Sequence, residues 1–85
     1  MFTGTLFGRK YIHDSGHSDL EGLKTFNVTM SRNLVSQRVM EALAKEGVFF
    51  ASEPWPDDIV RIYVKITEKN ALVNAIEIWE AKVQS

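Results

Sequence analysis

The 85-residue chain contains no cysteine, which excludes disulfide bonds, thiolate nucleophiles and cysteine-based zinc or iron–sulfur sites. It has only two histidines, His13 and His17, so a metal ion would need these imidazoles together with carboxylates. No apolar run approaches the roughly 20 residues that a membrane-spanning helix requires. We therefore expect no cofactor and no membrane partner.

The chain also lacks an excess of charge of either sign. Its formal net charge of −1 provides no overall attraction to nucleic acid or to an anionic membrane surface. The first residues have no basic stretch ahead of an apolar run, so we expect no secretion signal and a cytoplasmic location. The apolar share of 45% and the charged share of 25% are typical of globular proteins. With no linker or low-complexity segment, residues 1–85 are expected to form a single domain.

Two strands are predicted in the first third of the chain. Residues Phe2–Ile12 are rich in β-forming side chains, although glycines interrupt them. Residues Leu23–Ser31 alternate, with Phe26, Val28 and Met30 on one face and polar residues on the other. The polar segment between these two strands is interpreted as a long hairpin loop.

The clearest helix is predicted from Leu34 to Glu46. Asn33 precedes it and can cap the free amides of the first turn. Gly47 follows it and suits the left-handed residue that ends many helices. The apolar stripe of this helix, at three- and four-residue spacing, consists of Val35, Val39, Ala42 and Leu43.

A short strand is predicted at Val48–Ala51 and a longer one at Ile59–Ile66. The segment Ser52–Asp58 between them is predicted to be a loop, because its two prolines cannot donate backbone hydrogen bonds. The longer strand alternates regularly, so one face is apolar and the other carries polar and aromatic side chains. The apolar face consists of Val60, Ile62, Val64 and Ile66.

A second helix is predicted after Thr67, which could serve as its N-cap. Since Ile76–Val83 contains many β-formers, a closing strand there is the alternative. The predicted fold class is α+β, with order β-β-α-β-β-α and two helices on one face of an antiparallel sheet of about four strands. The apolar stripe of the second helix consists of Leu72, Ala75, Ile76, Trp79 and Val83.

Both histidines lie in the polar segment "YIHDSGHSDLE" of residues 11–21. His13 and His17 are four residues apart, but Gly16 between them disfavours the helix that would bring both imidazoles to one side. The segment does not fit a calcium-binding loop, and a catalytic triad within one loop would lack a buried base. A solvated turn is the preferred interpretation, a weak metal site at these histidines is the second, and catalysis is the third.

The polar face of the predicted sheet could bind single-stranded nucleic acid. Arg61, Tyr63 and Lys65 alternate with the apolar residues of their strand, and the first predicted strand is expected to add Arg9 and Tyr11 to the same face. Aromatic rings that stack on bases, flanked by cations that contact phosphates, are typical of such surfaces. The same residue types also suit any solvent-facing antiparallel sheet, which is the competing interpretation.

Phe49, Phe50 and Trp55 form the third candidate. Alternation prevents Phe49 and Phe50 from both pointing into one core, so one of them is expected at the surface. A rigid exposed aromatic is a typical anchor of a protein–protein interface. The alternative is that Trp55 folds back over the core.

These observations favour a small non-enzymatic protein-binding module of the adaptor, inhibitor or immunity type, with a protein partner or a second copy of itself. Single-stranded nucleic-acid binding on the Arg61–Lys65 strand is the alternative function. A metal-binding loop at the two histidines ranks third.

Overall fold

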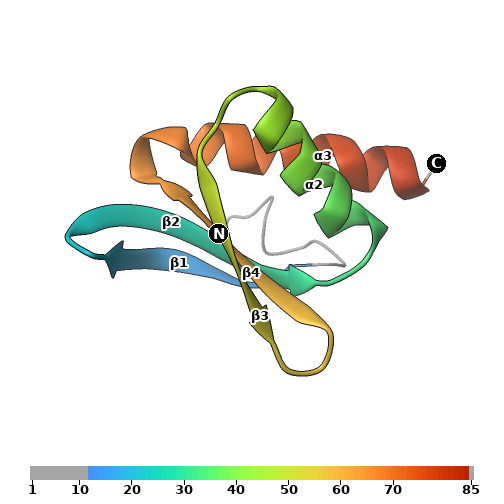
Figure 1. The fold of residues 1–85 in the computed structure, drawn as a ribbon. Helices are drawn as coiled ribbons and strands as arrows, with labels where there is room; N and C mark the ends of the chain where they lie inside the picture. Colours follow the sequence, from blue (N-terminus) through green and yellow to red (C-terminus); the bar gives the residue numbers. More distant parts are fainter. Residues whose placement is uncertain (1–11, 85) are drawn as a thin grey trace.

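Within the described part of the chain, two helices lie on one face of a four-stranded antiparallel sheet (Figure 1). The computed structural model describes residues 12–84, and their side chains from residue 14 to residue 82. The sheet order is β1-β2-β4-β3, so β1 and β3 form its edges. The predicted α+β class and element order are thereby confirmed. The elements are β1 (Ile12–Leu20), β2 (Leu23–Ser31), α2 (Leu34–Lys45), β3 (Phe50–Trp55), β4 (Ile59–Lys65), the 3-10 helix η1 (Ile66–Glu68) and α3 (Lys69–Gln84).

Helix α2 begins at Leu34 as predicted and ends at Lys45, one residue before the predicted Glu46. The side chain of Asn33 accepts a hydrogen bond from the Ser36 amide at 3.2 Å, and the Ser36 hydroxyl accepts one from the Asn33 amide at 3.0 Å. At the other end Gly47 adopts φ 78°, and the Val48 amide donates to the Leu43 carbonyl at 2.9 Å. These contacts satisfy the backbone groups that a helix leaves free at its two ends.

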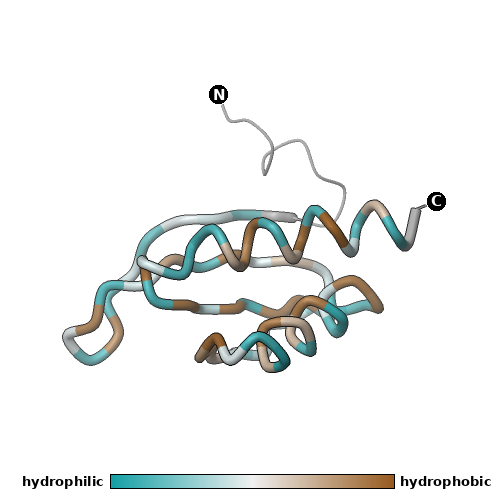
Figure 2. The backbone as a smooth tube through the Cα atoms, turned by 90° about the horizontal axis from the view of Figure 1, so that it is seen from above, coloured by the Kyte–Doolittle hydropathy of each residue, from teal (hydrophilic) through white to brown (hydrophobic). Residues whose placement is uncertain are grey.

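The core lies between the sheet and the two helices. Figure 2 views the fold from above, with hydrophobic and hydrophilic residues alternating along both helices. That alternation is expected when each helix buries one side. The buried apolar residues among the described side chains are Phe26, Val28, Met30, Val35, Val39, Leu43, Val60, Ile62, Val64, Leu72, Ala75 and Ile76.

The polar segment around the histidines is a strand, so its interpretation as a hairpin loop was wrong. Only Glu21 and Gly22 form the turn, with φ angles of 52° and 83°, and Leu20 pairs directly with Leu23. Two left-handed residues are typical of the tight turn that joins two hairpin strands. Among the described elements, only β2 contacts β1 extensively. An edge strand that neither α2 nor α3 covers needs no apolar alternation, and therefore periodicity did not reveal it.

Strand β3 also differs from the prediction, because it continues through Pro54 to Trp55. Pro54 pairs with Val60, and only 56–58 form the turn that follows. Proline is tolerated in an edge strand when its nitrogen faces away from the neighbouring strand. The prolines therefore limit further pairing beyond β3 without ending the strand itself.

The last segment is helical, which excludes the alternative of a closing strand over residues 76–83. Thr67 is not an N-cap, because the chain enters α3 through the 3-10 helix that contains it. Glu80 is only 1% exposed, although it is charged. It lies four residues after Ile76 and therefore continues the buried stripe of α3. The predicted first strand, Phe2–Ile12, lies outside the described residues except for its last residue.

Candidate functional site

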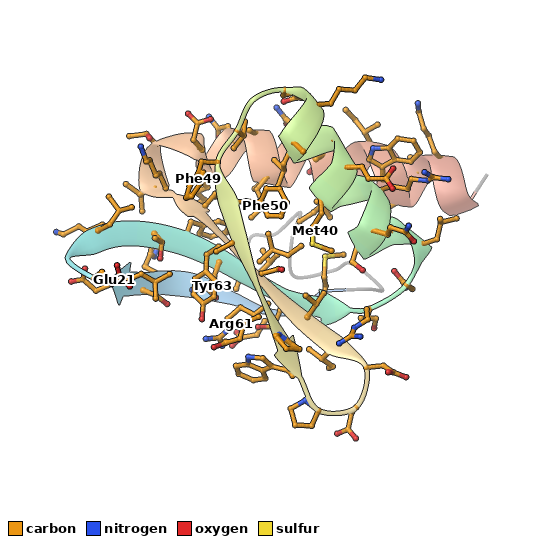
Figure 3. The ribbon with its side chains drawn as sticks, viewed as in Figure 1. Glu21, Met40, Phe49, Phe50, Arg61 and Tyr63 are labelled. Carbon is orange, nitrogen blue, oxygen red and sulfur yellow. The ribbon has the colours of Figure 1, made fainter. Side chains whose placement is uncertain are left out.

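The face of the sheet that points away from the helices carries the candidate site. Residues opposite each other on neighbouring antiparallel strands share a face. Arg61 and Tyr63 of β4 therefore lie on the same face as their β3 partners Glu53 and Ala51. Figure 3 shows Arg61 and Tyr63 together on this side of the sheet. We call this surface the open face.

Strand β2 contributes polar side chains that already form hydrogen bonds within the sheet. Thr25, Asn27 and Thr29 lie on the open face, yet each is only 4% exposed. The Thr25 hydroxyl donates to the Ser18 carbonyl at 3.2 Å, and the Asn27 amide donates to the Ser18 hydroxyl at 2.7 Å. These bonds link β2 to the polar strand β1. A ligand on the open face would consequently meet the side chains of β3 and β4 first.

Arg61 is held against two aromatic rings. Its guanidinium carbon lies 4.3 Å from the centroid of the Trp55 ring and 5.9 Å from that of Tyr63. Its Nε donates a hydrogen bond to the Thr29 hydroxyl at 3.2 Å. Because Arg61 pairs with Thr29 on one side and Glu53 on the other, sheet register brings these groups together. Cation–π contact and this hydrogen bond fix the plane of the guanidinium.

Glu53 links the two rings from β3. Its Oε1 accepts hydrogen bonds from Trp55 Nε1 at 2.7 Å and from the Tyr63 hydroxyl at 3.1 Å. These two bonds, first that of Trp55 and then that of Tyr63, lower the pKa of the Glu53 carboxyl below its usual value. A small desolvation effect opposes them, and the charge of Arg61 adds to the lowering. The carboxylate therefore stays ionised at neutral pH.

An apolar groove lies at the other end of the open face, beside the β1–β2 turn. Its volume is about 300 Å³. Phe49, Leu23 and Leu20 contribute apolar surface there and are 78%, 46% and 38% exposed. Contiguous exposed apolar surface of this kind marks interaction sites in soluble proteins. The lining residues are Leu20, Glu21, Leu23, Thr25, Phe49, Phe50, Ala51, Tyr63, Val64 and Lys65.

Phe49 is exposed because of the path that the chain takes after α2. The left-handed Gly47 turns the chain, and Val48 then packs against the core. Phe50 opens β3 opposite Val64 and also packs against the core, so the residue between them projects outward. Figure 3 shows Phe50 on the Met40 side and Phe49 away from it. Phe49 is therefore an exposed anchor on a well-defined backbone.

The predicted protein-binding residues separate into three environments. Phe49 projects from the groove rim, Phe50 is half-buried in the groove wall, and Trp55 lies at the far end of the open face against Arg61. Trp55 does not cover the helix-side core, since it shares its face with Glu53 and Ala51. These residues are parts of one face and do not form a single cluster.

The predicted nucleic-acid residues are brought together only in part. Arg61 and Tyr63 share the open face, and Lys65 follows them at the groove. Arg9 and Tyr11 lie outside the described residues.

Three contributors to the site were missed. Leu20 and Leu23 were assigned to a loop and a strand end, and Glu53 to a loop. The Glu21-Gly22 pair between the two leucines was the available signal, because acidic-glycine pairs favour tight hairpin turns.

His17 does not form a metal site with other described side chains. The His17 ring contacts Phe26 edge-on, with 5.7 Å between the ring centroids. The side chain of His13 lies outside the described part of the structure. Among residues with described side chains, no three or more histidine, aspartate or glutamate groups come together. In the same part of the chain, no helix is long and apolar enough to cross a membrane.

Comparison of the chain with models of protein families, with curated proteins and with solved structures finds no match.

Proposed function

We propose that this chain is a non-enzymatic protein-binding module whose partner docks in the apolar groove beside Phe49. The observation that carries the proposal is the exposure of Phe49, at 78%, next to two exposed leucines of the β1–β2 turn. Aromatic anchors of this type contribute much of the binding energy in protein interfaces. Their removal from water on binding is favourable, at about 25 cal/mol per Å² of apolar surface.

The backbone around the groove supports this function. One wall begins at the hydrogen-bonded end of α2, and the other is a tight two-residue turn. Phe50 anchors the rim to the core. A partner would therefore bind a largely preformed surface and would lose little free energy in ordering it.

The open face suits a protein partner better than single-stranded nucleic acid. One face of the Trp55 ring is already covered by Arg61, which competes with a stacked base. Nucleic-acid binding is therefore the second candidate, supported by Arg61, Tyr63 and Lys65 alone.

Docking on the face is also favoured over pairing with the β3 edge. Pro54 removes one backbone donor from that edge strand. A partner strand added there would leave one of its carbonyl groups without a hydrogen bond. The groove offers apolar contact without that cost.

A random peptide library displayed on phage tests the proposal. We expect selected peptides to bind the wild type and to lose at least about tenfold in affinity for Phe49→Ala and for Leu23→Thr. Ile78→Ala is the matched control, because Ile78 is an exposed apolar residue on α3, outside the groove lining. Peptides that bind all variants equally, or a library that yields no binder, would contradict the proposal.

Self-association is tested separately by sedimentation velocity. A dimer that Phe49→Ala dissociates and Ile78→Ala does not would identify the partner as a second copy.

A further inference from the structure

The guanidinium of Arg61 is held in place but has unused hydrogen-bond donors. Trp55 and Tyr63 lie against it, and its Nε is bonded to the Thr29 hydroxyl. Its two terminal amino groups form no hydrogen bond or ion pair with any residue between 14 and 82. A planar pair of N–H donors in a fixed orientation matches the two oxygens of a carboxylate.

Glu53 does not occupy these donors, although it lies on the neighbouring strand. Its Oε1 accepts from Trp55 and Tyr63, and no described carboxylate oxygen lies within 4.0 Å of the Arg61 nitrogens. The Glu53 carboxylate thus fixes the two rings that support the guanidinium. A carboxylate from outside can approach the free side of Arg61 without displacing an existing ion pair.

Arg61 and the apolar groove lie on the same face at a defined separation. Tyr63 contacts the guanidinium and also lines the groove. Val64 and Lys65, which follow it on β4, line the groove as well. Arg61 and the groove residue Lys65 share a face because they lie four positions apart on β4, which corresponds to about 13 Å. An extended peptide covers the same distance in about four residues, and its side chains four positions apart also share a face.

We propose that the groove and Arg61 form one continuous site for an extended protein segment that presents an apolar side chain and a carboxylate about four residues apart. The apolar side chain enters the groove beside Phe49, and the carboxylate binds the terminal amino groups of Arg61. The acidic occupant follows from the oriented terminal amino groups of Arg61, because Lys65 and Glu21 bring opposite charges to the groove itself. This inference rests on the proposed protein-binding function and specifies the chemistry of its partner.

Short acetylated peptides provide the probe, with binding followed by fluorescence anisotropy. Two peptides place a leucine and a glutamate four positions apart, one in each order, in a serine–threonine background. Matched peptides replace the glutamate with glutamine or the leucine with alanine. On the wild type we expect the glutamate peptide to bind about five- to tenfold more tightly than its glutamine counterpart.

Two variants of the protein localise the effect. In Arg61→Gln the glutamate and glutamine peptides should bind equally, while dependence on leucine persists and shows that the groove is intact. In Lys65→Gln most of the preference for glutamate should remain, because no ring contact holds this cation. An equal loss of the preference for glutamate in both variants would indicate general electrostatic attraction and would overturn the assignment to Arg61.

The peptide binding results distinguish failure of this inference from failure of the proposed function. Leucine-dependent binding with no difference between glutamate and glutamine would overturn the inference alone. No binding of any peptide up to about 1 mM would overturn both. A single-stranded oligothymidylate of about ten nucleotides is tested alongside the peptides. If it binds more tightly than every peptide and loses affinity for Arg61→Gln, this face would be assigned to nucleic acid instead. A dimer that Phe49→Ala dissociates would assign the groove to a second copy.

Discussion

The guanidinium of Arg61 stacks on the indole ring of Trp55, with 4.3 Å between the guanidinium carbon and the ring centroid. The two residues lie on neighbouring strands, one on β4 and one on the edge strand β3. Their contact connects the candidate carboxylate site to the hydrogen bonds of Glu53. Four tests of the folded protein follow from this arrangement and from the turns and rim around it.

The stacking contact should be measurable as a coupling energy. A double-mutant cycle of Trp55→Ala and Arg61→Ala is expected to give about 0.5–1 kcal/mol, which is typical of cation–π pairs at exposed sites. Urea unfolding of the wild type, the two single variants and the double variant provides the four free energies of unfolding. Effects that add to within about 0.3 kcal/mol would show that the two side chains do not interact.

The pKa of Glu53 makes part of the stability dependent on pH. The folded-state pKa is lowered from the usual 4.5, so folding favours the ionised carboxylate. This contribution is present above 4.5 and is lost as the pH falls through the lower folded-state value. Wild type should therefore lose more stability than Glu53→Gln between about pH 5 and about pH 3.

Urea unfolding midpoints at several pH values measure this difference for the two proteins. Carboxyl carbon shifts in NMR titrations give the pKa of Glu53 directly. A value at or above 4.5 would contradict the two hydrogen bonds assigned to its Oε1.

Adjacent phenylalanines should differ in their contribution to stability. Phe49→Ala is expected to change the free energy of unfolding by less than about 0.5 kcal/mol, because its side chain is largely exposed. Phe50→Ala should cost about 2 kcal/mol, since its ring packs partly into the core. Thermal and urea unfolding of both variants provide the comparison. Equal costs would place both rings in the same environment and would remove Phe49 as an exposed anchor.

Two glycines of the β1–β2 hairpin offer a matched test of its turn. A side chain would meet no atom within 4 Å at either Gly16 or Gly22, but only Gly22 has a positive φ, at 83°. Gly22→Ala should cost about 1 kcal/mol, because left-handed backbone is strained for alanine. Gly16→Ala should be neutral or slightly stabilising, since glycine weakens a strand. The reverse order, measured by urea unfolding, would contradict a turn at Glu21-Gly22.

The parts of the fold that periodicity predicted are those that face the core. Strand β4 alternates because its Val60, Ile62 and Val64 are buried, and α2 has a recognisable cap at Asn33 and end at Gly47. The edge strands were missed or shortened because pairing with one neighbour, and not burial, determines their structure. In β1 polar residues are tolerated on both faces, and in β3 a proline is tolerated on the outer edge.

The open face was predictable from alternation along a single strand. Arg61 and Tyr63 were correctly placed together, because they alternate with the buried residues of β4. The contribution of Leu20 and Leu23 depends on which strand lies beside which, and the sequence pattern of one strand carries no such information. The roles of Glu53 and Trp55 likewise depended on the unexpected continuation of β3.

The most direct test of the central claim is to map where a bound peptide contacts the protein. Amide chemical shifts of the labelled protein would be recorded during titration with the tightest peptide from the displayed library. We predict that the largest changes fall on the turn residues 20–23, on Phe49 to Ala51 and on Tyr63 to Lys65. Changes confined to the outer surfaces of α2 and α3 would contradict the assignment of the groove as the binding site.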